Sequence, residues 1–477
     1  MAKVESVHDF LKGKTILVTG ATGFVGKVSV EKILRVQPDI KKLYLLLRAS
    51  NPYLATHRLQ NEVIGKDIFR VLRDKWGADF GSFISKKVVA VAGDVSLNNL
   101  GIKDENMRSQ MFEELNVIVH TAATTNFNER EMNSVSGLLA SLAHKFDVVM
   151  HVPAIPLVGY DIAIGTNTMG AFHVVNFAKS CHKLEIVLHV STAYVCGEAE
   201  GLIVEEPLHV NGMQKGSTKL DIELEKQLIE EKLKEFKAHN TDKEVITSVM
   251  KSFGLARANL HGWPNTYVFT KAMGEILLMK MKDTLPLFVI RPTTVVSTHS
   301  EPFPGWIEGV RTIDFVVVNY GQGILTSFVG NSETILDLIP VDMVVNFMIV
   351  ALMALSKGFY FLHLFVPAPS KKTHIPTKMM KPIITSSHPV LTLHFWVSFI
   401  TMISTTSTST QPLPSDVVIC AINKKGIIAL WGTRSKKGCK KQLSILQCEF
   451  KPPMHLGQLI KQLKQSRKGV KKRYEGK

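Results

Sequence analysis

The feature that most constrains the fold is a glycine motif directly behind a short apolar segment. Residues Lys14 to Thr19 read KTILVT, which is typical of a buried parallel strand. Residues Gly20 to Gly26 read GATGFVG, and an amphipathic pattern follows through Leu34. A strand, a Gly-x-x-Gly-x-x-Gly turn and a helix form a dinucleotide-binding unit, because glycines let backbone approach a pyrophosphate at the helix N-terminus. The alternative is a plain tight turn, since a glycine pattern alone is weak evidence.

Further apolar segments continue a βα series and predict an α/β protein with a Rossmann-type doubly wound parallel sheet. The predicted strands are Lys42–Leu47, Val88–Ala92, Val117–His120, Ile186–Val190 and Leu287–Arg291. Helical spacing recurs over Ile164–Ala178, and Ile335–Leu355 predicts a last strand and helix. Asp221–His239 has alternating charges, and we expect a solvated surface helix or lid there.

Arginine follows the second predicted strand at a position that distinguishes nicotinamide cofactors. The strand leads into Arg48-Ala49-Ser50. An NAD-selective site usually has Asp or Glu here for the ribose 2′-hydroxyl, whereas a basic side chain accommodates a 2′-phosphate. Arg48 therefore favours NADPH, and the alternative is an ordinary solvated arginine.

The next two predicted strands end in residues suited to a bound nucleotide. Gly93-Asp94-Val95 follows one, where Asp94 is placed to reach the adenine edge. Thr121-Ala122-Ala123-Thr124 follows the other, and its small side chains let a cofactor lie against the strand end. The alternative for both is a loop that needs short side chains, and their place in the βα series favours the cofactor.

A tyrosine and a lysine four residues apart lie in a segment that predicts the start of a helix. Residues 261–278 read HGWPNTYVFTKAMGEILL, and Pro264 suits the first turn. The spacing places Tyr267 and Lys271 on one helical face. An ammonium group beside a phenol favours phenolate, so we expect Lys271 to lower the pKa of Tyr267. The alternative is a buried tyrosine beside a surface lysine.

A hydroxyl at another strand end completes a candidate catalytic set. Ser191-Thr192-Ala193-Tyr194 follows the strand Ile186–Val190. There the Thr192 hydroxyl could donate a hydrogen bond to a substrate carbonyl beside Tyr267 and Lys271. The alternative is a capping residue, which is the usual role of Ser or Thr at a strand end.

The positive charge of the chain is concentrated in its last quarter. From Lys357 onward there are 21 Lys and Arg and three acidic residues, whereas the preceding residues hold 36 basic and 38 acidic residues. A basic tail of this kind can contact a membrane surface peripherally, and the alternative is an ordinary solvated segment. We exclude a nucleic-acid partner, because no recognition module accompanies the charge.

Cysteine usage and hydropathy indicate the cytoplasmic side of the cell. The five cysteines lack metal-site spacing and are typical of reduced thiols. The first residues resemble neither a signal peptide nor a clear transit peptide. No apolar run reaches the length of about 18 residues that a spanning helix needs.

Together these motifs resemble the extended short-chain dehydrogenase/reductase superfamily, and within it the plant-type alcohol-forming fatty acyl-CoA reductases. The resemblance covers about residues 8 to 354. The segments that carry it are KTILVTGATGFVGK, KKLYLLLRAS, VAGDVSLNNLGI, TAATTNFNER, VLHVSTAYVCGE, HGWPNTYVFTKAMGE, IRPT and EPFPGWIEG.

The resemblance implies reduction of a long-chain acyl-CoA through an aldehyde to a primary alcohol for waxes or related lipids, with NADPH at an endoplasmic-reticulum or other cytoplasmic-face location. Tyr267, Lys271 and Thr192 would be catalytic, with Lys271 also on the nicotinamide ribose. The remaining cofactor-binding residues would be Gly20, Thr22, Gly23, Phe24, Val25, Gly26, Arg48, Asp94, Val95, Ala122 and Pro292.

The chain departs from the family pattern in two places, which sets the predicted domains. An NADPH-binding domain over residues 8–300 contains an insertion at 131–159, and a substrate-binding part follows at 301–355. A basic, low-complexity and partly disordered tail at 356–477 stands where the family has its C-terminal domain. Two other functions share the catalytic set: a dehydrogenase or epimerase acting on another alcohol or sugar nucleotide, and a catalytically dead NADP-binding paralogue.

Overall fold

A computed structural model describes residues 7–124, 159–197, 208, 220–281, 285–309, 312–322 and 338–356, and from there onward 360–361, 400–405, 417–423, 426–429, 431–432 and 446–447. Most of the expected insertion at 131–159 and most of the expected disordered tail lie outside these residues. The proposed domain boundaries therefore stay predictions.

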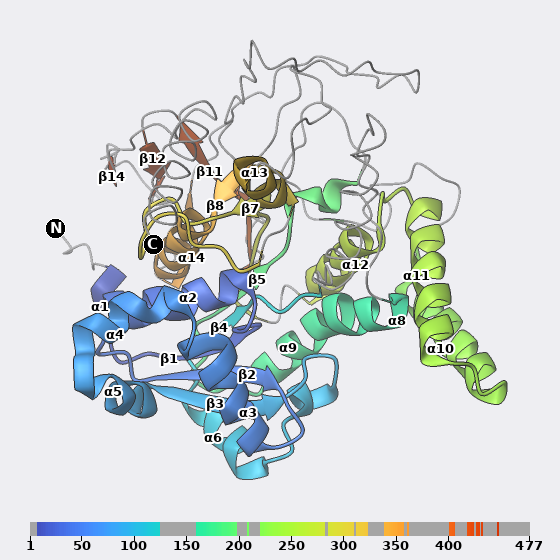
Figure 1. The fold of residues 1–477 in the computed structure, drawn as a ribbon, viewed down its shortest axis with the longest axis horizontal. Helices are drawn as coiled ribbons and strands as arrows, with labels where there is room; N and C mark the ends of the chain where they lie inside the picture. Colours follow the sequence, from blue (N-terminus) through green and yellow to red (C-terminus); the bar gives the residue numbers. More distant parts are fainter. Residues whose placement is uncertain are drawn as a thin grey trace, which may run out of the picture.

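A parallel sheet forms the centre of the molecule and has the strand order 3-2-1-4-5-6 (Figure 1). This is the doubly wound order predicted from the βα series, so the Rossmann-type fold is confirmed. The order reverses between β1 and β4, and ligands of doubly wound folds bind at such a switch point. In spatial order, the strands of the central sheet are β3 (Val88–Gly93), β2 (Lys42–Arg48), β1 (Thr15–Thr19), β4 (Val117–His120), β5 (Ile186–Val190) and β6 (Leu287–Ile290).

Strands after residue 356 extend this sheet beyond β6. β10 (Ile400–Thr405) pairs antiparallel with β6, and β11 (Val417–Asn423), β12 (Gly426–Ala429) and β14 (Leu446–Gln447) follow outward. Two small pairs lie apart from it. They are β7 (Thr294–Val296) with β8 (Leu338–Pro340), and β9 (Tyr360–Phe361) with β13 (Trp431–Gly432).

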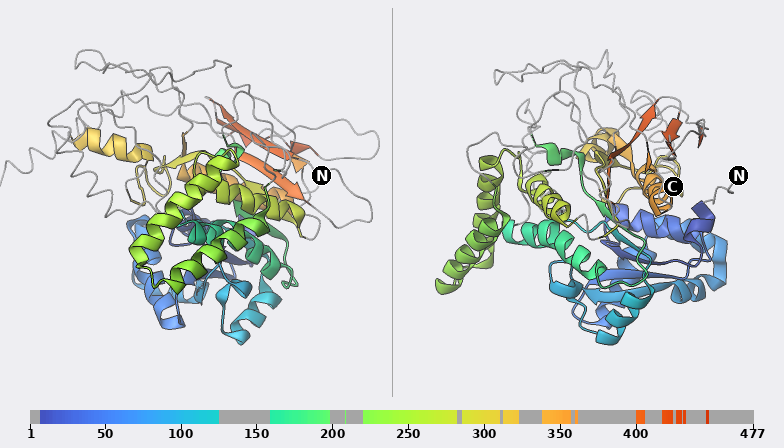
Figure 2. Two further views of the ribbon diagram at one scale, coloured as in Figure 1. Left: turned by 90° about the vertical axis from the view of Figure 1, so that its right-hand side faces the viewer. Right: turned by 180° about the vertical axis from the view of Figure 1, so that it is seen from behind.

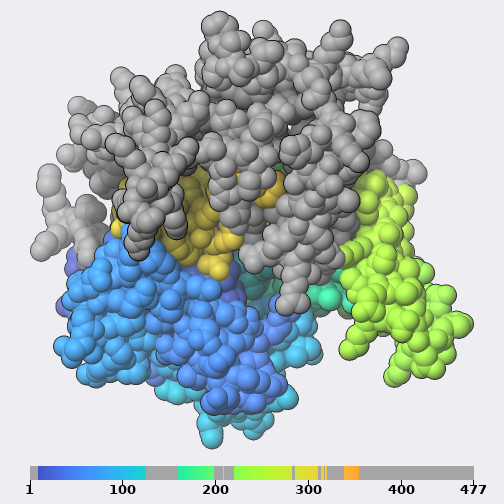
Figure 3. Space-filling view, in the orientation of Figure 1, coloured from blue at the N-terminus to red at the C-terminus, as the bar shows by residue number. Residues whose placement is uncertain are grey.

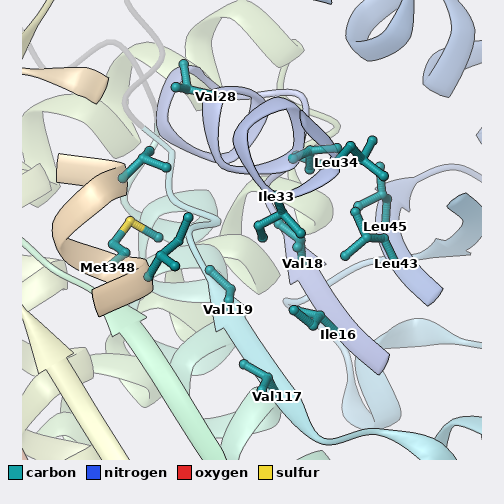
Figure 4. Packing of buried hydrophobic residues seen from close by; sticks show 14 of the residues in the cluster. Ile16, Val18, Val28, Ile33, Leu34, Leu43, Leu45, Val117, Val119 and Met348 are labelled. Carbon is teal, nitrogen blue, oxygen red and sulfur yellow. The ribbon is translucent and has the colours of Figure 1, made fainter. Parts of the chain in front are cut away.

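One face of the sheet packs against helices α2 (Phe24–Val36) and α14 (Val341–Ser356). Alternate strand residues supply the apolar contacts, because successive side chains of a strand point to opposite faces. Figure 4 shows this packing around β1, β2, β4 and α2, with Met348 of α14 beside them. The labelled residues are Ile16, Val18, Val28, Ile33, Leu34, Leu43, Leu45, Val117, Val119 and Met348.

The opposite face packs against α6 (Glu105–Glu114), α9 (Gly170–Ala178) and the end of α12 (Thr266–Lys280) (Figure 1). Leu17, Ile118 and Val187 lie on this face. The remaining helical segments are α1 (Val7–Leu11), α3 (Pro52–Arg58), η1 (Leu59–Ile64), η2 (Asp67–Phe69), α4 (Arg70–Trp76), η3 (Gly77–Asp79), α5 (Phe80–Lys87), η4 (Asn98–Gly101), α8 (Tyr160–Ala163), η5 (Ile164–Met169), η6 (Ala193–Cys196), α10 (Ile222–Ala238), α11 (Lys243–Leu260) and α13 (Thr312–Gln322).

Helices α10 and α11 form a hairpin at one end of the molecule, outside the sheet (Figures 1 and 2). Its outer side is visible at the edge of the surface in Figure 3. The expectation of a solvated helix is wrong for its inner face, where Glu225 is fully buried. The Glu225 carboxylate accepts hydrogen bonds from Tyr160 Oη at 2.8 Å and Arg257 Nε at 2.9 Å, and it lies 3.1 Å from His261 Nε2. This hub ties α8, α10 and α11 together.

The predicted helix around Tyr267 exists, but its first turn begins later than expected. α12 starts at Thr266, and Asn265 is its N-cap, accepting a hydrogen bond from the Val268 amide at 3.0 Å. Pro264 therefore precedes the cap. The reason is that an asparagine side chain satisfies an orphan N–H of the first turn, which proline cannot do.

Candidate active site

The glycine turn between β1 and α2 has the close approaches that its sequence predicts. Gly20 has a φ of +75°, and a Cβ there would lie 2.6 Å from the Ala122 amide nitrogen. A Cβ at Gly26 would collide with the Gly20 carbonyl oxygen, whereas one at Gly23 would lie 3.2 Å from it. The first glycine thus allows the turn against the end of β4, and the third allows helix and turn to pack closely.

The N-terminus of α2 has the donor set that an anion requires. Gly23 is its N-cap, and no described side chain caps it. The first N–H groups of a helix lack intrahelical acceptors and carry the positive end of the helix dipole. Thr22, Phe24 and Val25 are partly exposed around this end, and Gly23 is exposed. A dinucleotide pyrophosphate therefore fits this turn.

The end of β2 presents a basic surface beside the glycine turn. Arg48 is exposed, and β2 pairs in parallel with β1, so both strand ends lie at the same edge. The Arg48 carbonyl accepts a hydrogen bond from Arg58 Nη1 at 2.6 Å, and Arg58 is held by Glu62. Sequence reasoning did not single out Arg58, because it lies ten residues after Arg48. Arg58 is the last residue of α3, and this helix brings it back to the Arg48 carbonyl.

Asp94 and Ala122 lie at the ends of β3 and β4 as the strand series predicts. The Asp94 carboxylate accepts hydrogen bonds from the Ser96 amide at 2.9 Å and the Ser96 hydroxyl at 2.8 Å, so one oxygen is engaged in its own turn. Val95 is buried, and its carbonyl lies 3.0 Å from His173 Nδ1. Ala122 packs directly against Gly20.

Lys271 reaches across from α12 to the end of β5. Its Nζ donates a hydrogen bond to the Val190 carbonyl at 2.8 Å and lies 3.3 Å from His189 Nε2. The lysine is 1% exposed. The start of the same helix region is also tied down, because Trp263 Nε1 donates to the Val195 carbonyl at 2.9 Å. The alternative of a surface lysine is therefore excluded.

The electrostatics of the pair differ from the expectation. Burial raises the pKa of Tyr267 to about 12, so the expected lowering by Lys271 is not found in this structure. Burial lowers the pKa of Lys271 to about 8, and the negative charge of Glu275 acts in the opposite direction. The physical reason is that desolvation disfavours the charged form of both groups. A phenol is neutral near pH 7 at either pKa, so Tyr267 carries the proton that a donor needs.

Thr192 lies on the connection that follows β5, two residues beyond the Lys271 contact at Val190. Its Oγ1 accepts a hydrogen bond from the Tyr194 amide at 3.4 Å, which makes it the N-cap of η6. Capping uses only an acceptor site, so the hydroxyl proton remains free to donate. Pro292, after β6, is buried and accepts a hydrogen bond from the Ala193 amide at 2.9 Å. The catalytic set itself stays a prediction.

Asn167, which sequence reasoning did not single out, links two parts of the candidate site. It lies in the π-helical segment η5 and is 1% exposed. Its Oδ1 accepts from the Thr124 amide at 2.9 Å, and its Nδ2 donates to Thr270 Oγ1 at 2.9 Å. Asn167 therefore joins the end of β4 to the helix that carries Tyr267. Irregular π turns of this kind are frequent at functional sites, but periodicity does not reveal them.

The segment after β7 packs along α2, from its first residue to its last turn. Glu308 pairs with the buried Lys27, and Glu301 pairs with Lys32 and Arg35. The rings of Phe24 and Trp306 lie 5.7 Å apart. Residues 301–308 are thereby fixed against α2, the helix that follows the glycine turn.

Comparison with known proteins identifies the family. The NAD-binding family model described as male sterility protein matches residues 18–136 and 135–348. The chain belongs to this family. The match divides at residues 135–136, within the segment expected to be inserted. Membership of this NAD-binding family supports a nicotinamide cofactor for the protein.

Curated relatives are named as fatty acyl-CoA reductases, so the resemblance noted from the motifs is confirmed. "Probable fatty acyl-CoA reductase 5" of Arabidopsis thaliana is 50% identical over 344 residues, which cover 72% of this chain and 64% of the relative. "Alcohol-forming fatty acyl-CoA reductase" of Simmondsia chinensis is 49% identical over 360 residues, covering 76% and 67%. This family member thus spans about two thirds of the length of the relatives it matches.

Among solved structures, a reductase domain of a nonribosomal peptide synthetase from Mycobacterium tuberculosis superposes with a TM-score of 0.44. The two are 22% identical, and the superposition covers 73% of this chain and 64% of that chain.

Proposed function

We propose that this protein reduces long-chain fatty acyl-CoA to a primary fatty alcohol through an aldehyde, with NADPH as the reductant. The observation that carries the proposal is the buried Lys271, hydrogen-bonded to the Val190 carbonyl two residues before Thr192, in a chain about half identical to fatty acyl-CoA reductases. The overall reaction consumes one acyl-CoA, two NADPH and two protons, and yields one alcohol, one CoA thiol and two NADP⁺.

Bound NADPH would supply the hydride, and the protein supplies geometry, charge and protons. The exposed glycine turn and the uncapped end of α2 would hold the pyrophosphate. Lys271, with its three donors, would hold the nicotinamide ribose while it remains fixed to Val190.

Tyr267 and Thr192 would act on the substrate oxygen. As hydride adds to the thioester carbonyl, negative charge develops on that oxygen, and hydrogen bonds from both hydroxyls would stabilise it. The resulting hemithioacetal expels the CoA thiolate and leaves the aldehyde. In the second reduction Tyr267 would donate its proton to the alkoxide. This step requires a protonated phenol, and Tyr267, with its raised pKa, is protonated near pH 7.

Arg48 supports the choice of NADPH over NADH. Its guanidinium is exposed at the β2 end, and Arg58 is bonded to its carbonyl. The exposed Arg48 guanidinium favours a 2′-phosphate, which carries charge that a 2′-hydroxyl lacks, whereas the charge of Arg58 is already paired with Glu62.

The basic tail supports a peripheral association with anionic membranes. From Lys357 onward 21 basic and three acidic residues contribute to it. No helix among the described residues has both the length and the apolar character needed to cross a bilayer. Flotation with vesicles that contain anionic lipid, compared with neutral vesicles, tests this association; equal binding to both would contradict it.

The function is tested by incubating purified protein with acyl-CoAs of several chain lengths and either NADPH or NADH. Gas chromatography of the products should detect fatty alcohol with NADPH, and Tyr267→Phe should abolish it while NADPH still binds. NADPH binding without any aldehyde or alcohol would identify a catalytically dead paralogue instead. Full activity in the Tyr267→Phe protein would refute the assigned proton donor.

A further inference from the structure

Three polar residues form a row across the central sheet beneath Lys271. Thr19 of β1 pairs in register with His120 of β4, which pairs in register with His189 of β5. All three are at most 1% exposed. They share the face of the sheet that packs against α9 and α12, because Leu17, Ile118 and Val187 lie two residues earlier in the same strands on that face.

Hydrogen bonds link both ends of this row. Thr19 Oγ1 lies 2.7 Å from His120 Nδ1, and the two imidazole rings lie side by side with centroids 4.9 Å apart. At the far end, His189 Nε2 lies 3.3 Å from Lys271 Nζ. An ammonium group has donors only, so His189 Nε2 must be the acceptor and the ring proton must lie on Nδ1.

The surroundings keep both imidazoles neutral. Burial lowers the pKa of His120 to about 3 and that of His189 well below its ordinary value, and the charge of Lys271 acts in the same direction. From α12, Lys271 and Glu275 are the charged groups nearby, and Glu275 is held by Arg291 at the end of β6. A neutral His189 therefore remains an acceptor throughout the range in which Lys271 titrates.

The row formed by Thr19, His120 and His189 should make the core less stable than apolar residues would. In the part of the chain that the structure describes, His120 Nε2 and His189 Nδ1 are buried without hydrogen-bond partners. Unpaired buried polar atoms cost free energy. Two residues earlier, on the same face of the sheet, the same strands carry the apolar residues Leu17, Ile118 and Val187. Apolar residues would fill this space at lower cost, so the polar row points to a role at the lysine.

We propose that His189 is a positioning residue that fixes the Lys271 ammonium through its Nε2 acceptor, with Thr19 and His120 holding the ring behind it. The role in catalysis rests on the proposed function, whereas the effect on Lys271 does not. His189 shares the lysine with the Val190 carbonyl, so two acceptors on consecutive residues of β5 define the direction of the ammonium. With these two acceptors occupied, the ammonium would have one donor left for a nicotinamide ribose.

Two near-isosteric variants test the acceptor. In His189→Gln the side-chain oxygen can replace Nε2, whereas His189→Met fills a similar space without an acceptor. Protein labelled with ¹³C at the lysine ε-carbon is titrated between about pH 6 and 10, and Lys271→Met identifies the Lys271 resonance. We expect His189→Gln to titrate as the wild type does. The midpoint in His189→Met should fall by about one pH unit, because the ammonium loses an acceptor. Equal titration of all three proteins would overturn the proposal.

Thr19→Val provides a second, milder probe that leaves His189 in place. It removes the hydrogen bond to His120, and we expect a smaller fall of the Lys271 midpoint in the same direction. If His189→Met does not fold, as judged by circular dichroism, an unchanged midpoint in Thr19→Val overturns the proposal instead.

The rate of alcohol formation as a function of pH separates this inference from the proposed function. In His189→Met the alkaline limb of kcat/KM should move to lower pH together with the lysine midpoint, and His189→Gln should restore it. A wild-type protein that shows the lysine shifts but forms no alcohol would refute the proposed function and leave the positioning role intact.

Discussion

Glu275 and Arg291 form a buried ion pair that ties α12 to the end of β6. Arg291 Nε lies 3.0 Å and Nη2 lies 2.6 Å from Glu275 Oε2, and Glu275 is fully buried. Glu275 follows Lys271 by one helical turn, so the pair also sets the position of the candidate catalytic lysine.

Removing one partner of this pair should destabilise the protein strongly. Arg291→Met leaves a buried carboxylate without its cation, at an expected cost of about 3–5 kcal/mol in the free energy of unfolding. Urea denaturation followed by circular dichroism measures the loss. Lys226→Met breaks an exposed pair with Glu223 and is the matched control, with an expected change within about 0.5 kcal/mol. Equal effects of the two substitutions would contradict this account.

Alanine should be tolerated better at Gly23, the second glycine of the turn, than at Gly26, the third, where its Cβ would collide with backbone. Gly26→Ala places a Cβ into the Gly20 carbonyl, so the turn must open and NADPH affinity should fall at least about tenfold. Gly23→Ala meets the same oxygen at 3.2 Å, and a smaller loss is expected. Quenching of protein fluorescence by NADPH gives both affinities, and a larger loss for Gly23→Ala would refute the assigned geometry.

Arg48→Met should weaken NADPH binding by about ten- to a hundredfold and leave NADH binding nearly unchanged, because only the 2′-phosphate loses a charged partner. Calorimetric titration with each cofactor measures the difference. Lys86→Met removes an exposed positive charge on α5, before β3, and should change neither affinity. A parallel loss for NADH would mean that Arg48 supports the fold of the site instead of reading the phosphate.

Lys271→Met should make the protein more stable at neutral pH while removing activity. The folded-state pKa of Lys271 is lowered to about 8 from its ordinary value of 10.5, so folding releases a proton between these pH values. Wild-type stability therefore rises with pH across this window and is reduced below pH 8, where a charged lysine stays buried. At pH 7 the variant should gain about 1–3 kcal/mol in unfolding free energy after the lost hydrogen bonds are subtracted.

Thermal denaturation of wild type and Lys271→Met at several pH values checks this sign. The difference in stability should shrink as the pH approaches 10.5. A gain that is independent of pH would indicate ordinary packing in place of a desolvated charge.

The local sequence pattern was sufficient to predict the strands and the glycine turn that build the candidate site. β4 (Val117–His120) and β5 (Ile186–Val190) begin and end at the predicted residues, because a strand buried on both faces reads as an uninterrupted apolar run. The glycine turn was predictable for a similar reason, since close backbone contacts exclude every side chain at Gly20 and Gly26.

Relations between distant residues were not predictable from such patterns. Asn167 and Thr270 are 103 positions apart, and the hydrogen bond between them exists only because η5 packs against α12. Glu225 was expected on a solvated face, and it is buried because α8 and α11 bring Tyr160 and Arg257 to it.

The amino-acid sequence by itself determined the order of strands and helices, the glycine turn and the placement of Tyr267 and Lys271 on one helix, because each depends on neighbours within a few residues. The tertiary structure alone decided how those groups ionise and what holds them. Desolvation raises the pKa of Tyr267 and lowers that of Lys271, and the Lys271 ammonium lies between His189 and Val190, because burial and long-range contacts arise only when separate segments pack together.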